Sequence, residues 1–150
     1  SDPVSASLAN DVESADGTTL VVGGRRTAMD GPFRAAVWRL EGDGVWARLP
    51  QDTEIFGGAQ IVNMNALVNA DGVWIAAGDM SDEAMTFRMG RVWASEDGIT
   101  WFRLDPEGDV FGTYGDGFVA VRNLTFDGER LIAVGQRFGV GAVWVGAIEP

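Results

Sequence analysis

The chain has 150 residues, 46% of them hydrophobic, which is enough for one domain with a buried core. It contains neither cysteine nor histidine, which excludes a disulfide framework, a thiolate metal site and a Ser-His or Cys-His catalytic pair. The formal net charge of -11 argues against nucleic acid as a partner, and no apolar run reaches the roughly 20 residues of a membrane-spanning helix, so membrane insertion is not expected.

An internal repeat is the main feature of the sequence. The segments SADGTTLVVGG, NADGVWIAAGD and TFDGERLIAVGQ align on an Asp-Gly pair, at spacings of 55 and 56 residues. A Val-Trp pair recurs at Trp38, Trp93 and Trp144, and a further Trp recurs at Trp46 and Trp101. Three landmarks in a constant order predict repeated structural units, which we place at 6–60, 61–117 and 118–150.

Each repeat reads as β-structure, because short apolar runs rich in Val, Trp and Ile lie between Asp-Gly or Gly-rich turns. In the second repeat we expect four antiparallel strands, at about 61–68, 73–78, 91–95 and 100–104. The strand at 73–78 is apolar on both faces, which is typical of a sheet that lies between two others.

Four antiparallel strands in a repeat of this length match a blade of a β-propeller. The sequence therefore predicts an all-β fold of about three four-stranded blades, with 1–150 as one propeller domain or half-domain. The third repeat has no room for a fourth strand before residue 150, so its blade is expected to be incomplete.

The stretch SEDGITW resembles the Asp-box of sialidase-like, BNR-repeat β-propellers. The residues that fall on the pattern are Ser95, Asp97, Gly98, Thr100 and Trp101. The stretch departs from it by one residue, because Asp97 and Gly98 are adjacent, and the first repeat carries only a degenerate version, LEGDGVW. The resemblance implies a propeller fold and, as in many such proteins, an extracellular or cell-surface location in a bacterium.

In this family the box is a structural turn, and its chemistry agrees with that role. Asp97 can accept backbone N–H groups of its own turn, Gly98 can adopt a positive φ, and a hydroxyl can tie the ends of the turn together. Trp101 is then expected to pack against the next blade. The alternative is a calcium site that uses Glu96 and Asp97, which needs several more oxygens; we expect no metal and no cofactor.

A closed propeller needs at least four blades, and this chain supplies about three. We expect two chains to join as a homodimer with a six-bladed ring. The alternative is that the chain is a segment of a larger propeller.

The long connections, 25–35, 51–60, 79–90 and 105–117, are expected on one face of the sheets, where a ligand would bind. Charged groups beside aromatic rings suit a carbohydrate or a protein surface. The candidate ligand-binding residues are Arg25, Arg26, Asp30, Asp79, Asp82, Arg88, Tyr114 and Arg137.

Three classes of function remain. A non-catalytic binding or scaffold module accounts for the pattern without any missing residue. A sialidase-like glycoside hydrolase is the enzyme alternative; the family's catalytic set is an Arg triad, a Tyr paired with Glu and an Asp, and Tyr114 is the only tyrosine. The third class is a structural element that self-assembles into a propeller.

Overall fold

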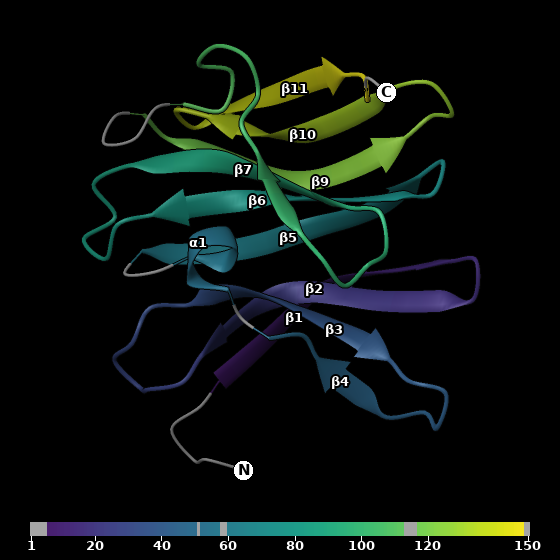
Figure 1. The fold of residues 1–150 in the computed structure, drawn as a ribbon. Coiled ribbons are helices and arrows are strands. Elements are labelled where there is room, and N and C mark those ends of the chain that lie inside the picture. Colours follow the sequence, from purple (N-terminus) through teal and green to yellow (C-terminus); the bar gives the residue numbers. More distant parts are fainter. Residues whose placement is uncertain (1–5, 51, 58–59, 113–116, 149–150) are drawn as a thin grey trace.

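The computed structural model describes residues 6–50, 52–57, 60–112 and 117–148. They form three antiparallel sheets, of four, four and three strands, and one short helix (Figure 1). The first sheet contains β1 (Ala6–Ala15), β2 (Thr18–Arg26), β3 (Arg34–Leu40) and β4 (Trp46–Arg48); the second contains β5 (Ile61–Ala70), β6 (Val73–Ser81), β7 (Arg88–Ser95) and β8 (Phe102–Leu104); the third contains β9 (Val119–Phe126), β10 (Leu131–Arg137) and β11 (Val140–Gly146). The all-β prediction is confirmed.

The Asp-Gly pairs close the first hairpin of the first two sheets. Asp16 and Gly17 have φ of 51° and 78°, and Asp71 and Gly72 have φ of 51° and 92°. Two consecutive residues in the left-handed region are the signature of a type I′ turn, whose twist matches that of the strands and for which Asp-Gly is a favoured pair. The local sequence therefore selects these two turns.

The third Asp-Gly pair lies one position earlier in its hairpin. The backbone N–H of Asp127 donates to the carbonyl of Arg130, so Gly128 and Glu129 occupy the two central positions, and Gly128 has a φ of 97°. The Asp127 carboxylate accepts the backbone N–H groups of Glu129 and Arg130. Equivalent strand positions of the second and third sheets are thus 57 residues apart, and not the 56 that the Asp-Gly alignment predicts.

The first strand of every sheet contains one extra residue, a β-bulge, opposite a glycine of the second strand. The bulged residues are Asn10, Asn65 and Arg122. The glycines are Gly23, Gly78 and Gly135, where an added Cβ would lie 1.8, 1.9 and 1.9 Å from a backbone oxygen of the bulged strand. The glycines allow the two strands to approach closely at the bulge.

Two hydrophobic clusters hold the three sheets in a stack. Leu20, Val22 and Val37 of the first sheet pack with residues of the second sheet such as Trp93 and Trp101. On its other face the second sheet packs Ala66, Ala77 and Ile75 against Leu124 and Ala133 of the third sheet. β6 is covered on both faces, as its apolar sequence predicts, and all its residues after Val73 are buried.

The connections of the sheets fall into two groups. The turns between the first and second strands lie together at one end of the stack, and the loops between the second and third strands lie at the opposite end (Figure 1). The loop 82–87 is shorter than predicted, because β6 and β7 pair as far as Ser81 and Arg88. Asp79 and Arg88 are therefore strand residues and do not belong to a loop.

The connection at 51–60 contains a single turn of helix, α1 (Thr53–Phe56), which the sequence did not predict. Asp52 caps it by accepting the backbone N–H groups of Glu54 and Ile55. One helical turn is too short to produce a 3.6-residue pattern, which explains why periodicity does not reveal it.

Candidate ligand-binding site

The box at residues 95–101 forms the turn between β7 and β8, and its side chains bond within the turn. Asp97 Oδ1 accepts the backbone N–H groups of Ile99 and Thr100 at 2.8 and 2.7 Å. Ser95 Oγ accepts the N–H of Gly98 at 2.9 Å, and Gly98 has a φ of 72°. The bonds from Thr100 and Ile99 lower the pKa of Asp97 to about 2. The box is thus occupied by its own backbone.

Trp101 packs in the direction opposite to the expected one. It is buried in the cluster between the first and second sheets, and not against the third sheet that follows it in the chain. Gly98 approaches the same cluster, because a Cβ added there would lie 3.1 Å from Leu20 of the first sheet. The box therefore fastens the second sheet to the sheet that precedes it.

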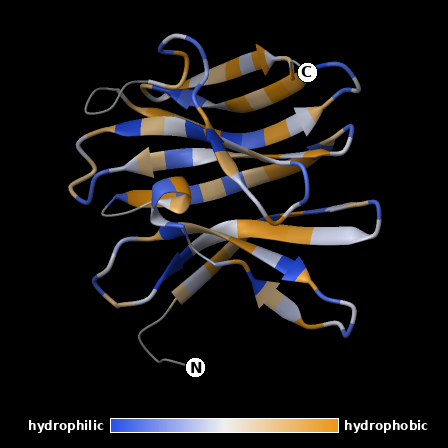
Figure 2. Ribbon diagram, viewed as in Figure 1, coloured by the Kyte–Doolittle hydropathy of each residue, from blue (hydrophilic) through white to orange (hydrophobic). Residues whose placement is uncertain are grey.

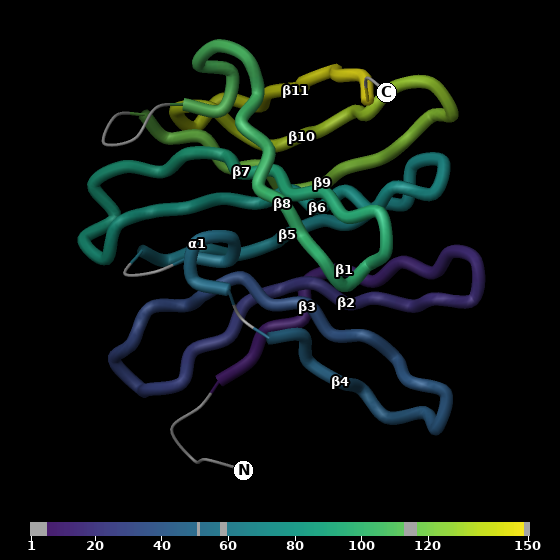
Figure 3. The backbone as a smooth tube through the Cα atoms, viewed as in Figure 1, coloured from purple at the N-terminus to yellow at the C-terminus, as the bar shows by residue number. Residues whose placement is uncertain are grey.

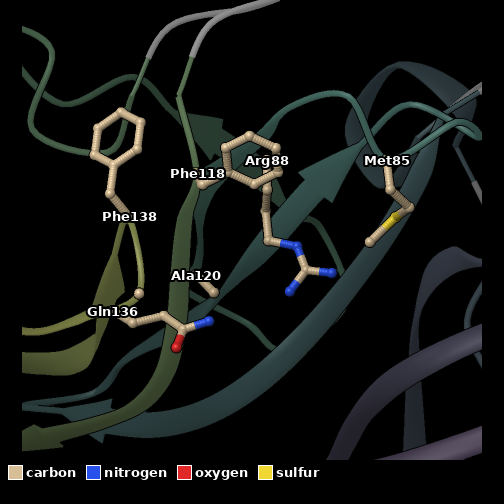
Figure 4. Close-up of a pocket in the computed structure, with 7 residues that line it drawn as sticks. Met85, Arg88, Phe118, Ala120, Gln136 and Phe138 are labelled. Atoms are coloured by element: carbon tan, nitrogen blue, oxygen red, sulfur yellow. The ribbon is translucent and has the colours of Figure 1, made fainter.

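A cavity of about 470 Å³ lies between the second and third sheets, at the end of the stack that carries the loops between second and third strands (Figure 4). Its lining comes from the loop before β7, from the start of β9 and from the hairpin between β10 and β11. The residues are Met85, Arg88, Phe118, Ala120, Gln136, Phe138 and Gly139. Its size is within the range of about 300–1,000 Å³ that is usual for ligand pockets.

The described parts of the connection from β8 to β9, residues 105–112 and 117–118, lie beside this region (Figure 3). They are held by backbone bonds from Gly90 N–H to the Phe111 carbonyl, from Arg88 N–H to the Gly117 carbonyl and from Phe138 N–H to the Phe118 carbonyl. These bonds fix the backbone around the two rings of the cavity. The rings of Phe118 and Phe138 themselves stay 45% and 62% exposed.

Beneath the cavity, Arg88 meets a buried polar group. Arg88 Nε lies 3.9 Å from Asp79 Oδ1, and Asn65 Nδ2 donates to Asp79 Oδ2 at 2.9 Å. Burial raises the pKa of Asp79, while Arg88, Asn65 and Arg122 oppose this effect. Asp79 thus lies within ion-pair distance of Arg88 and within hydrogen-bond distance of Asn65.

Of the predicted ligand-binding residues, the structure brings together Asp79 and Arg88, and Arg137 follows the cavity residue Gln136 on β10. Asp82 instead accepts the backbone N–H of Thr86 at 2.6 Å and the hydroxyl of the same residue, so it stabilises its own loop. The predicted Tyr114 lies outside the described residues.

The other three predicted residues belong to the first sheet and lie apart from the cavity. Arg25 and Arg26 end β2, and Asp30 is exposed in the loop that follows. The guanidinium of Arg26 lies over the ring of Phe33, 5.2 Å from its centroid. The residues that line the cavity beside Arg88 do not include these three.

The sequence pattern did not single out Met85, Phe118, Gln136 or Asn65. Phe118 stands at the border between two predicted repeats, and Met85 and Gln136 carry no motif. Asn65 could have been found from the sequence, because it lies 55 residues after Asn10, which is the spacing between the first two repeats. The bulge that gives both asparagines the same position is visible only in the paired strands.

Within the described ranges, no group of three or more Asp or Glu residues is placed to hold a metal ion. The described chain also contains no helix of the length and apolarity that crossing a membrane requires.

The chain was compared with known proteins in two ways. No protein-family model matches it, and no curated protein matches it.

Proposed function

We propose that the chain is a non-catalytic binding module built from β-propeller blades, and that its ligand occupies the cavity between Arg88, Phe118 and Phe138. The three sheets are then three blades, and the cavity lies on the face of long connections where propellers bind ligands. The observation that carries the proposal is the pairing, in one concave site, of two exposed aromatic rings with an arginine held from below by Asp79.

The shape and charge of the site favour a carbohydrate over a protein surface. Protein interfaces are broad, whereas this cavity is concave and of the size of a small-ligand pocket. Exposed rings such as Phe118 and Phe138 can cover the C–H face of a sugar, while Arg88 and Gln136 donate to its hydroxyl groups. Because Asp79 lies within ion-pair distance of Arg88 and the chain carries a net charge of -11, we propose a neutral sugar and not a polyanionic one.

A separate observation favours the alternative of a self-assembling propeller element: the outer faces of the first and third sheets expose apolar residues. In our proposal the two roles combine: the blades close into a six-bladed homodimeric ring, and each copy contributes one such cavity to the same face. An extracellular or bacterial cell-surface setting, where glycans are abundant, is part of the proposal. The hydrolase alternative depends on Tyr114, outside the described residues.

The experiment is a glycan array of neutral and sialylated oligosaccharides, followed by titration of the strongest neutral hit. We expect Phe138→Ala to weaken binding by roughly tenfold, or about 1.4 kcal/mol. Because the ligand is uncharged, raising the salt concentration from about 0.1 to about 0.5 M should leave the affinity nearly unchanged. Arg88→Gln should weaken binding by a similar factor.

A matched control is Phe102→Ala. Phe102 is also a largely exposed phenylalanine, but it lies on β8, away from the cavity. Binding that falls equally in both variants, or an array on which no glycan binds, contradicts the proposal. Release of sugar product during the titration would instead support the hydrolase.

A further inference from the structure

Apolar residues lie uncovered on the two outermost faces of the stack, within the described part of the chain. On the third sheet, paired positions of β10 and β11 place four residues on the face that points away from the second sheet: Ile132, Val134, Val143 and Val145. We call this the leading face; hydrophobic residues, coloured orange, occur along both strands in Figure 2. Val143 and Val145 are 66% and 60% exposed, so the face is open to solvent.

The first sheet has a similar surface, which we call the trailing face, on the side that points away from the second sheet. Register places Val12, Val21 and Trp38 in one row across β1, β2 and β3, with Trp46 opposite Leu40 on the same side. The alternate residues of these strands, Leu20 and Val22, fill the core toward the second sheet. Val12 is 56% exposed and Trp46 is 45% exposed.

The repeat relates the residues of these two faces to residues that are buried where neighbouring sheets meet. The residues 55 positions after those of the trailing face are Leu67, Ala76, Trp93 and Trp101, all buried where the second sheet meets the first. The residues 57 positions before Ile132 and Val134 are Ile75 and Ala77, both buried where the second sheet meets the third. Each exposed face thus occupies the position of one side of an interface that the chain already makes internally.

A polar contact between the first strands of neighbouring sheets repeats in the same way. The bulged Asn10 donates from Nδ2 to the Met64 carbonyl at 2.8 Å, and the bulged Asn65 donates to the Val121 carbonyl at 2.8 Å. The third bulged residue is Arg122, an exposed hydrogen-bond donor. The acceptor that corresponds to Met64 and Val121 is the Ala9 carbonyl, at the start of the stack.

We infer that a second copy of this chain covers both faces. Its trailing face packs on the leading face of the first copy, and Arg122 of the first copy donates to the Ala9 carbonyl of the second. The leading face of the second copy packs in the same way on the trailing face of the first, and these two contacts close the two copies into a ring. This inference rests on the proposed blade architecture, but it does not depend on what the cavity binds.

The test is analytical ultracentrifugation of the full chain and of single variants over a hundredfold range of concentration. Wild type should sediment as a particle of twice 16.0 kDa. Val143→Asp places a carboxylate in the leading face and should raise the dissociation constant of the dimer at least tenfold. Val12→Asp should have the same effect from the trailing face.

Val140→Asp is the matched control. Val140 is a valine of the same strand and is 69% exposed. Because side chains alternate along β11, it points to the face opposite that of Val143 and Val145. This variant should dimerise like wild type. Circular dichroism of all variants shows whether the sheets are intact, because the three valines are largely exposed and their replacement should leave the fold unchanged.

Mixing Val143→Asp with Val12→Asp tests the head-to-tail arrangement. The mixture contains one pair of unaltered faces, so it should recover a dimer that neither variant forms alone at the same concentration. If instead the leading face packs on itself, Val12→Asp dimerises like wild type and the mixture gains nothing, which overturns the inference. A wild-type monomer at every concentration also overturns it, and glycan binding by that monomer would leave standing only the proposed binding role of the cavity.

Discussion

The side chain of Asn10 donates a hydrogen bond to the carbonyl of Met64, and Asn65, 55 residues later, makes the same bond to Val121. Each bond joins the first strands of two neighbouring sheets. Both asparagines stand at a β-bulge, where the backbone turns the extra side chain toward the next sheet. The bulges therefore provide a polar contact that repeats between neighbouring sheets.

Replacing Asn65 by Ala should destabilise the chain more than an average substitution. The change leaves the Val121 carbonyl and Asp79 without a donor that they now share. We expect a loss of about 1–3 kcal/mol in the free energy of unfolding, measured by urea denaturation. Thr27→Ala, an exposed loop substitution, is the control and should stay within about 0.5 kcal/mol of wild type; equal effects of the two changes would refute the role of the bond.

Gly78→Ala should be among the most damaging single substitutions. The added Cβ would lie 1.9 Å from the Asn63 carbonyl oxygen, so the paired strands must separate at the bulge. We expect a loss of about 3 kcal/mol or more. Gly42→Ala is the matched comparison, because nothing lies within 4 Å of its added Cβ. A midpoint of thermal unfolding that is unchanged in Gly78→Ala would show that the strands are not held so closely.

The contribution of Asp97 to the stability of the folded chain should depend on pH. The pKa of Asp97 is about 2 in the folded chain, below its value of about 3.9 in an unfolded chain. The stabilisation by its carboxylate is therefore complete above pH of about 4 and is lost as the pH falls through the folded value. Asp97→Asn should be less stable than wild type at pH 7, and the difference should shrink between pH of about 4 and 2 in denaturation curves. A difference that does not vary with pH contradicts this account.

Asp79 should behave in the opposite sense. Its folded pKa is raised, chiefly by burial, so folding disfavours the ionised carboxylate relative to the unfolded chain. The stability linked to this group is present below the unfolded pKa of about 3.9 and is lost as the pH rises through the folded value. The stability of Asp79→Asn relative to wild type should therefore increase as the pH rises above about 4. If it decreases, the contacts with Arg88 and Asn65 outweigh burial.

Much of the fold can be predicted because its signals are local. Two of the Asp-Gly pairs form type I′ turns, and the run that is apolar on both faces marks β6 of the covered second sheet. The bonds of the turn at 95–101 are also local, since Asp97 and Ser95 bond to each other and to backbone groups of the same turn.

The parts that the sequence pattern missed depend on contacts between distant segments. Whether Asp79 is a loop or a strand residue depends on how far β6 pairs with β7. The direction in which Trp101 packs depends on which sheet lies on each side of β7 and β8. The cavity combines residues of three connections, and Phe118 has no motif of its own. The pairing of β6 with β7 brings Arg88 close to Asp79.

The central claim is that these three sheets are half of a ring. Light scattering of the unmodified chain on a sizing column, at several concentrations, tests it most directly. The account predicts a stable particle of twice 16.0 kDa, with a mass that does not increase further as the concentration rises, because a ring has no free face. A mass of 16.0 kDa at all concentrations, or one that grows without limit, would contradict it.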